Sequence, residues 1–257
     1  MKRFDGLTCL LTGATGGFGV VTARRLAAEG ARLVLSDLKA EPLEALAASL
    51  DADTATLAGD VGAPQFHHDL VALARETFGA LDVAINNAGI ANPVNRIEDI
   101  PEDEAEAVIR IDLMGVFWAL QAQIPAMDQR KGGKGGAIVN LASAAGVSGA
   151  PTIGIYAAAK HGVVGLSKTA AAENARRGIR VNAVCPAYAR TPMVEVGLLG
   201  DAGVSPEQAE QNLVRGVPMR RLGTPDEVAQ AILFAAAPEN GFMTGQSIIV
   251  DGGINAI

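Results

Sequence analysis

The stretch Thr12-Gly13-Ala14-Thr15-Gly16-Gly17-Phe18-Gly19 directly follows a short apolar run, Leu7–Leu11, and leads into a helical pattern. Glycine at position 13 permits a tight turn, and glycines at positions 17 and 19 let backbone N–H groups approach an anion where the helix begins. The spacing is T-G-x-x-x-G-x-G rather than the strict G-x-G-x-x-G, because position 22 is threonine. Its place between a first strand and a first helix predicts a diphosphate-binding turn.

Apolar runs typical of buried strands alternate along the chain with longer helical patterns. Such runs fit strands covered on both faces, and strict alternation with helices implies a parallel sheet with right-handed crossovers. We therefore predict an α/β fold, a single doubly wound Rossmann-type domain over residues 1–257 with a seven-stranded, mostly parallel sheet and helices on both faces. The expected strands are Leu7–Thr12, Arg32–Ser36, Thr54–Ala58, Leu81–Asn86, Ala137–Leu141, Arg180–Val184 and Ser247–Val250. The expected helices are Gly17–Glu29, Glu41–Leu50, Pro64–Phe78, Glu102–Gln129, Ile153–Arg177 and Pro225–Ala236.

The region from Pro186 to Thr224 breaks this alternation, because it is rich in glycine and proline and carries only one short helical pattern, Pro206–Arg215. An insertion of this length in a compact domain is usually functional. It follows the sixth strand, on the side where ligands bind in such sheets. We predict a substrate-binding lid at about residues 187–224.

Composition argues against several classes of protein. The chain has 257 residues and a formal net charge of -7, which disfavours a nucleic-acid-binding surface. No apolar stretch typical of a signal peptide follows the basic start, and no window reads as a membrane span. Cys9 and Cys185 lie in apolar strand-like runs and are expected to be buried thiols; adjacent His67 and His68 point apart on a helix, so we expect no metal site. We expect a cytoplasmic protein with neither membrane nor nucleic acid as a partner.

Asp37 ends the second predicted strand, 20 residues after Gly17. A carboxylate there can accept hydrogen bonds from the 2′-OH of an adenosine ribose and would repel a 2′-phosphate. Leu38 follows, and Lys39 is the only nearby cation. The pattern favours NAD over NADP, although an aspartate here could also serve only as a turn residue.

Tyr156 and Lys160 stand four residues apart on a predicted helix and so share one face, and Ser143 precedes Tyr156 by 13 residues. A free tyrosine has a pKa of about 10, and an ammonium fixed nearby lowers that pKa towards the working range of a general base. The phenol could then exchange a proton with a substrate oxygen. Taken alone, the pair could equally be two surface residues of a helix.

Several further segments occur in a characteristic order. They are Asp60-Val61, Asn86-Asn87-Ala88-Gly89, Ile138–Ser143, the Tyr156–Lys160 run, Arg180–Asn182 with Pro186 and Thr191, and Asp251–Gly253. Together with the glycine-rich turn, these segments resemble the short-chain dehydrogenase/reductase family, in its compact branch of roughly 250 residues. The resemblance covers Gly6 to Gly253. Some stretches of this sequence are similar to stretches of bacterial NAD-dependent dehydrogenases that act on cyclic alcohols and diols.

The resemblance implies roles for individual residues. Tyr156 would be the general base for alcohol oxidation and the general acid for ketone reduction. Lys160 would lower the pKa of Tyr156 and bind the nicotinamide ribose, and Ser143 would hold the substrate oxygen. The implied NAD contacts are Gly13, Thr15, Gly16, Gly17, Phe18, Gly19, Asp37, Leu38, Asp60, Val61, Asn87, Ala88, Gly89, Tyr156, Lys160, Pro186, Ala187, Ala189, Thr191 and Met193.

Three positions depart from the family pattern. Asp112 stands at the fourth catalytic position, where the family usually has an asparagine that belongs to a water relay reaching the lysine. Ala187 replaces the usual glycine after Pro186, and Ala142 replaces the first of two serines. An ionised Asp112 close to Lys160 would help keep that lysine protonated, whereas a carboxyl group buried alone would itself be protonated.

The predicted substrate contacts are mostly apolar. They are Ser143, Ala145, Tyr156, Tyr188, Met193 and Leu198. We expect an uncharged hydrophobic secondary alcohol or ketone, cyclic, aromatic or steroid-like. Two alternatives stay open: a 3-oxoacyl-thioester reductase, and a non-catalytic nucleotide-binding regulator on the same fold.

Two long predicted helices, Glu102–Gln129 and Ile153–Arg177, are apolar over more than one face, with Phe117, Trp118, Leu120 and Val164 exceeding what one sheet can cover. In the family these helices pair across a dimer interface, and the last strand helps to form a tetramer. We therefore expect a homotetramer, a dimer of dimers.

Overall fold

The computed structural model describes residues 2–196 and 204–256. Seven strands form one sheet in the order β3-β2-β1-β4-β5-β6-β7, and every neighbouring pair is parallel. The predicted doubly wound α/β fold is confirmed, with a sheet that is parallel throughout rather than mostly so. The strands are β1 Thr8–Thr12, β2 Arg32–Asp37, β3 Thr54–Ala58, β4 Val83–Asn86, β5 Gly136–Leu141, β6 Ile179–Pro186 and β7 Ser247–Val250.

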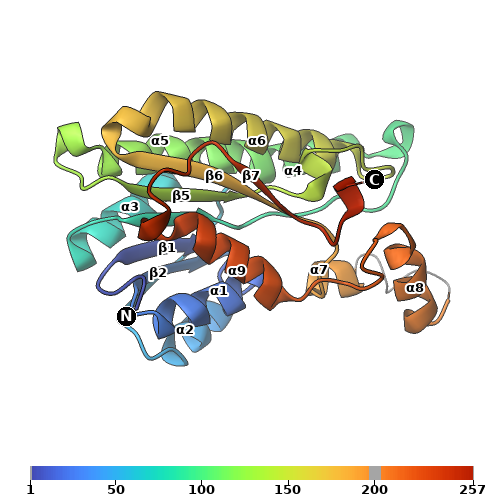
Figure 1. Ribbon diagram of the computed structural model, residues 1–257, viewed down its shortest axis with the longest axis horizontal. Helices are drawn as coiled ribbons and strands as arrows, with labels where there is room; N and C mark the ends of the chain where they lie inside the picture. Colours follow the sequence, from blue (N-terminus) through green and yellow to red (C-terminus); the bar gives the residue numbers. More distant parts are fainter. Residues whose placement is uncertain (1, 197–203, 257) are drawn as a thin grey trace.

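Helices cover both faces of the sheet (Figure 1). One layer contains α1, α2 and α9, and the other contains α3, α4, α5 and α6; α1 packs on α9, and α3 packs on α5. Their bounds are α1 Gly17–Ala28, α2 Ala40–Ala48, α3 Pro64–Phe78, α4 Glu102–Val108, α5 Gly115–Met127, α6 Gly154–Asn174, α7 Pro192–Val194, α8 Pro206–Leu213 and α9 Pro225–Ala236.

The order of strands brings distant segments to one edge of the sheet. The chain reverses its direction of winding at β1, which lies between β2 and β4. Because all strands run in parallel, the turns after β1, β2, β4 and β5 emerge at the same edge. Ligands bind at such a switch point, outside the carboxyl ends of the strands.

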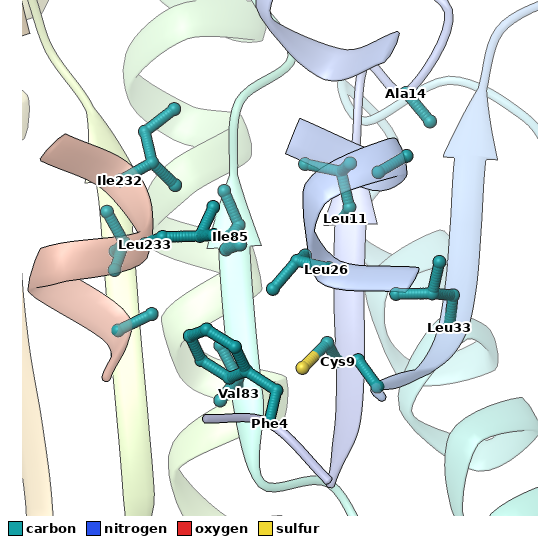
Figure 2. Close-up of a cluster of buried hydrophobic side chains, with 14 of the residues drawn as sticks. Phe4, Cys9, Leu11, Ala14, Leu26, Leu33, Val83, Ile85, Ile232 and Leu233 are labelled. Carbon is teal, nitrogen blue, oxygen red and sulfur yellow. The ribbon is translucent and has the colours of Figure 1, made fainter. Parts of the chain in front are cut away.

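Two apolar clusters fill the space between the sheet and its helical layers. In the first, Leu26 of α1 and Leu233 of α9 pack over β1 and β4, with Phe4 at the base (Figure 2). Full burial of each such side chain contributes about 1.5–3 kcal/mol. Cys9 and Cys185 are both fully buried and free, as predicted.

A buried set of polar side chains joins β4 and β5 to the α5–α6 layer. Asn86 and Gln123 exchange hydrogen bonds of 2.7 and 3.1 Å between their amides. Asn86 also donates to Asn140, which donates to Ser167 at 2.9 Å. A buried polar network with its members paired in this way holds the ends of the strands in a unique arrangement.

The prediction of one continuous helix from Glu102 to Gln129 is wrong at its centre. A π-helical turn, η2 (Ile109–Met114), separates α4 from α5. Its wider spiral accommodates an extra residue, and such turns frequently occur at functional sites. The stretch Glu102–Met127 is long and apolar enough to cross a membrane by length and composition alone, and 44% of its most apolar window is buried inside the protein.

The helices predicted over Glu102–Gln129 and Ile153–Arg177 leave less apolar surface uncovered than the sequence suggested. Leu120 and Val164 are buried within the chain itself. Trp118 is half-buried, and Phe117 remains 36% exposed. The argument for a partner from uncovered apolar surface therefore rests on Phe117 and Trp118.

The region predicted to form a lid, residues 187–224, has a small apolar core among its described residues. Val194, Val214, Val217 and Leu222 pack there with Ala209 of α8. Arg190 donates two hydrogen bonds to the carboxylate of Glu210, at 2.8 and 2.9 Å, and so ties the end of β6 to α8. The predicted helix Pro206–Arg215 ends at Leu213 and continues as a 3-10 turn.

Candidate active site

The glycine-rich turn is compact because its glycines leave no room for side chains. Gly13 has a φ of +64°, and a Cβ placed there would lie 2.8 Å from Ala88 Cα. The side-chain amide of Asn87 donates to the carbonyls of Thr12 and Gly13, at 3.0 and 2.9 Å. A Cβ on Gly19 would lie 2.0 Å from the Gly13 carbonyl oxygen. The turns after β1 and β4 are therefore locked together.

The start of the lid packs directly on this turn. A Cβ on Gly17, the first residue of α1, would lie 2.7 Å from Thr191 Cγ2. The structure thus brings together two residues that are far apart in sequence and that were both predicted to contact the cofactor. Gly16 precedes the helix as its N-cap, Phe18 packs partly against the core, and Met193 is 46% exposed.

Asp37 turns its carboxylate towards the glycine-rich turn. Its Oδ2 accepts hydrogen bonds from the backbone N–H of Thr15, at 2.8 Å, and from the Thr15 hydroxyl, at 2.7 Å. Its Oδ1 accepts from the N–H of Leu38, whose side chain is exposed. No Lys or Arg in the described ranges forms an ion pair with Asp37. The edge after β2 therefore presents an uncompensated negative charge.

Asp60 and Val61 are held by two residues that are not among the predicted cofactor contacts. Arg110 of η2 donates to Asp60 Oδ2 at 2.7 Å, and this hydrogen bond lowers the pKa of the Asp60 carboxyl. His67 of α3 lies with Nε2 2.8 Å from the Val61 carbonyl oxygen. Burial lowers the pKa of His67, which favours the neutral ring that can donate there.

Lys160, Tyr156 and Asp112 form a cluster beneath the loop that follows β4. Lys160 Nζ lies 2.9 Å from Asp112 Oδ2 and 5.4 Å from the centre of the Tyr156 ring, and it donates to the Leu141 carbonyl at 3.1 Å. Burial lowers the pKa of Lys160. The charge of Asp112 and the neighbouring Tyr156 raise this pKa by more than burial lowers it, so the net shift is upward. Lys160 is therefore a buried, protonated cation.

Ser143 follows β5 by two residues and is the N-cap of a short 3-10 turn, Ala144–Gly146. Its Oγ accepts from the N–H of Ala145 at 3.1 Å and lies 3.4 Å from the Pro186 carbonyl oxygen. The turn packs against α6, since a Cβ on Gly146 would lie 2.7 Å from the Lys160 carbonyl oxygen. The fold thus places the turn that carries Ser143 beside the helix that carries Tyr156 and Lys160.

The remaining predicted contacts lie around the start of the lid. Ala187 donates its N–H to the Val250 carbonyl, and Ala189 is buried in the first apolar cluster. Tyr188 lines a cavity of about 350 Å³ between the lid and the end of β7. None of Ser143, Tyr156 and Lys160 lines this cavity, so the cavity is separate from the cluster that they form. Leu198 lies outside the described residues.

Arg180, which the family resemblance grouped with Pro186 and Thr191, lies away from the predicted cofactor contacts. Its guanidinium donates to the carbonyls of residues 235, 236 and 237 at the C-terminal end of α9, and to that of Met243. It satisfies carbonyls that the end of the helix leaves without partners. Arg180 is therefore a structural cap near the start of β6, far along the strand from Pro186.

Three contacts in the site were not predicted from the sequence: Arg110 on Asp60, His67 on Val61, and the Leu141 carbonyl on Lys160. Each joins side chains or backbone atoms from different elements. Only Arg110 carried a hint, because it precedes Asp112 by two residues on the same predicted helix.

Comparison with known proteins agrees with this geometry. Residues 13–255 match the family model described as Enoyl-(Acyl carrier protein) reductase. The chain is 38% identical to cyclohexanol dehydrogenase of Acinetobacter sp. (strain SE19), covering 98% of this chain and 96% of the relative. It is also 38% identical to 3-oxoacyl-(acyl-carrier-protein) reductase of Thermotoga maritima, covering 98% and 99%.

Solved structures extend the comparison. The crystal structure of levodione reductase superposes with a TM-score of 0.93 at 37% identity, covering 99% of both chains. NAD+-bound xylitol dehydrogenase gives a TM-score of 0.91 at 34% identity, covering 98% of this chain and 100% of the other. The fold and these likenesses define a nicotinamide-dependent oxidoreductase that acts on CH–OH groups. The chain belongs to the short-chain dehydrogenase/reductase family.

Proposed function

We propose that the protein is an NAD(H)-dependent dehydrogenase of uncharged, hydrophobic secondary alcohols, cyclic or aromatic, that interconverts them with the corresponding ketones. The observation that carries the proposal is the cluster of Tyr156 with the buried ion pair of Lys160 and Asp112, at the sheet edge that also holds the glycine-rich turn. A nucleotide-binding regulator would have no use for a phenol beside a buried ammonium.

The residues present fit a nicotinamide dinucleotide. The turn at Gly13 and Gly17 is a cradle in which any side chain would collide with its neighbours, so backbone N–H groups at the start of α1 can approach a diphosphate. The carboxylate of Asp37 would accept from the ribose hydroxyls and repel a 2′-phosphate, which supports NAD over NADP. When bound, this cofactor accepts or supplies the hydride.

The protein's own residues would handle the proton. In alcohol oxidation, Tyr156 Oη accepts the hydroxyl proton of the substrate, and in ketone reduction it returns a proton to the carbonyl oxygen. The Lys160 ammonium stabilises the phenolate that the oxidative direction requires. Ser143 Oγ donates to the substrate oxygen and so stabilises the charge that develops there.

The substrate class follows from the predicted walls. Ala145 and Met193 are apolar, and walls of this kind favour a substrate without charge. Arg190 is close in sequence to Tyr188 and Met193, but its guanidinium is paired with the carboxylate of Glu210. Among the relatives, cyclohexanol dehydrogenase carries a cyclic alcohol in its name, which supports a cyclic substrate here.

The test is NADH formation with a panel of cyclic, aryl and linear secondary alcohols. We expect turnover with NAD+ on cyclic or aryl members and a strong preference for NAD+ over NADP+. Tyr156→Phe should abolish turnover while leaving the affinity for NADH nearly unchanged, as measured by fluorescence titration. Tight NADH binding by the intact protein without turnover of any member would favour the regulator.

A 3-oxoacyl-thioester reductase is the second candidate, favoured by the similarity to the Thermotoga maritima reductase. It predicts NADPH-dependent reduction of a short 3-oxoacyl thioester that exceeds the rate on cyclic ketones. The uncompensated carboxylate of Asp37 argues against that cofactor. Comparing both cofactors on one thioester and one cyclic ketone separates the candidates.

The assembly and location complete the proposal. We propose a cytoplasmic homotetramer in which the α4–α5 and α6 helices, with Phe117 at their exposed side, face a second subunit and β7 approaches a third. As an edge strand with Ile249 44% exposed, β7 leaves a surface suited to pairing. Sedimentation that gives a monomer at micromolar concentration contradicts this assembly.

A further inference from the structure

The Asp112–Lys160 pair is enclosed on every side. Asp112 is fully buried, and the Lys160 side chain is 5% exposed. Asp112 Oδ1 accepts the N–H of Ile90 at 2.8 Å, which leaves Oδ2 to face the ammonium. A Cβ on Gly89 would lie 3.1 Å from Oδ2 and 3.2 Å from Nζ, so a larger residue there would press on both members of the pair.

The two charges belong to different elements and meet only through the fold. Asp112 projects from the π-helical turn η2, and Lys160 projects from α6. An isolated ammonium at this depth would be strongly destabilised, whereas a carboxylate 2.9 Å away compensates its charge. The net charge beneath Tyr156 is therefore close to zero rather than +1.

We propose that Asp112 is a positioning residue that neutralises the Lys160 ammonium and thereby sets the pH at which Tyr156 exchanges its proton. The proposal rests on the proposed dehydrogenase function. An amide at position 112 would leave the phenol facing a bare cation, which favours the phenolate. A carboxylate instead makes the phenolate harder to form and moves alcohol oxidation towards alkaline pH.

Few other titratable groups surround the pair. Tyr156 lies on the same helix as Lys160, and Cys185 of β6 is the thiol nearest to the lysine; burial raises the pKa of that thiol to about 11, so it is neutral at physiological pH. The loop after β4 and the end of β5 contribute only backbone groups, the Ile90 N–H and the Leu141 carbonyl. The upward shift of the Lys160 pKa, against the lowering effect of burial, agrees with this arrangement.

Asp112→Asn is the direct test, because it removes the charge and keeps an oxygen that can accept from Ile90. Removing a negative charge lowers the pKa for the first proton lost by the coupled Tyr156–Lys160 pair, whichever group loses it. The midpoint of the acidic limb of kcat/KM for alcohol oxidation should move to lower pH by about one unit or more. The plateau should also fall, because part of the deprotonated enzyme then carries a neutral lysine. An unchanged midpoint, or a shift to higher pH, overturns the proposal.

Asp128→Asn is the matched control. Like Asp112, Asp128 has an almost fully buried carboxylate that is paired with a cation, in this case Arg130. Unlike Asp112, it lies at the C-terminal end of α5, away from Tyr156. This variant should lower stability and leave the midpoint where it is. If both variants move the midpoint equally, the effect is general and the proposal fails.

A second measurement does not depend on turnover. The chain has two tyrosines, Tyr156 and Tyr188, so a Tyr188→Phe background lets tyrosinate absorbance report Tyr156 alone. In that background, Asp112→Asn and the smaller Asp112→Ser should both bring the first rise of tyrosinate absorbance to lower pH. If tyrosinate absorbance first rises at the same pH in the folded variants as in the Tyr188→Phe background, Asp112 does not have this role. Absence of turnover with an intact shift would instead contradict only the proposed function.

Discussion

Replacing Lys160 with methionine should destabilise the protein because it leaves the Asp112 carboxylate buried without its partner. The ammonium that lies 2.9 Å from Asp112 Oδ2 is lost, and the described surroundings offer that carboxylate only the Ile90 N–H, on its other oxygen. Breaking a buried pair from one side costs about 3–5 kcal/mol. For a chain of this size, each kcal/mol corresponds to about 2–4 °C in Tm, so Lys160→Met should melt about 6–20 °C below the wild type.

The double variant Asp112→Asn/Lys160→Met separates charge from packing. It removes both charges but keeps an acceptor for Ile90, and removing both partners of a buried pair is often close to neutral. Thermal unfolding followed by circular dichroism should therefore show most of the lost Tm recovered. If Lys160→Met melts like the wild type, or if the double variant is no more stable than the single one, the pair is not the compensated buried charge described above.

The pH dependence of folding stability tests the same ion pair. Burial lowers the pKa of Lys160 and Asp112 raises it, with a net upward shift in the folded state. A raised folded pKa contributes stability that is fully present below the unfolded value, about 10.4, and is lost as pH rises through the folded value. The stability that Lys160 contributes to the wild type should hold through neutral pH and decline only in strongly alkaline solution. A decline already between pH 6 and 8 (about the range where histidines titrate) contradicts this assignment.

Three further predictions concern other parts of the chain. Gly13→Ala should lower the free energy of unfolding in urea by about 1–3 kcal/mol more than Gly79→Ala, because both glycines have positive φ but only the first has backbone atoms where a Cβ would lie. Equal losses would mean that the close approach of the two turns is relieved at little cost. Asp37→Ala should raise the KM for NAD+ about tenfold or more and erase the preference over NADP+, since a charge-assisted hydrogen bond is worth about 1.5–3 kcal/mol; an unchanged cofactor ratio contradicts the assignment. The thiols of Cys9 and Cys185 should react with a disulfide reagent far more slowly in native than in urea-unfolded protein, because burial raises the pKa of both and excludes the reagent; rapid labelling of the native protein contradicts their burial.

Much of the fold could be predicted because its signals are local. The strands Thr54–Ala58 and Ser247–Val250 and the helices Pro64–Phe78 and Pro225–Ala236 have the same bounds as predicted. Apolar runs, proline at the start of a helix and glycine at its end act within a few residues, so they can be read without knowledge of the neighbours. The glycine-rich turn belongs to the same class, since its φ of +64° at Gly13 requires a residue without Cβ.

The site was predicted only where its residues carry their chemistry in sequence. The spacing of Tyr156 and Lys160 already implied a shared helix face. Arg110 on Asp60 and the cap made by Arg180 could not be anticipated, because each depends on which carbonyls or carboxylates the fold places around one side chain. The π-helical turn was missed for a related reason: its extra residue leaves the apolar periodicity of a long helix almost unchanged.

The sequence was enough to predict the alternation of strands and helices, the glycine-rich turn and the pairing of a phenol with an ammonium, since each depends on contacts within one or two turns of chain. It also showed that position 112 carries a carboxylate. Only the tertiary structure decided what that carboxylate does. The crossing of η2 over α6 buries Asp112 against Lys160 and excludes water, and in such surroundings a charge either finds its partner or destabilises the protein.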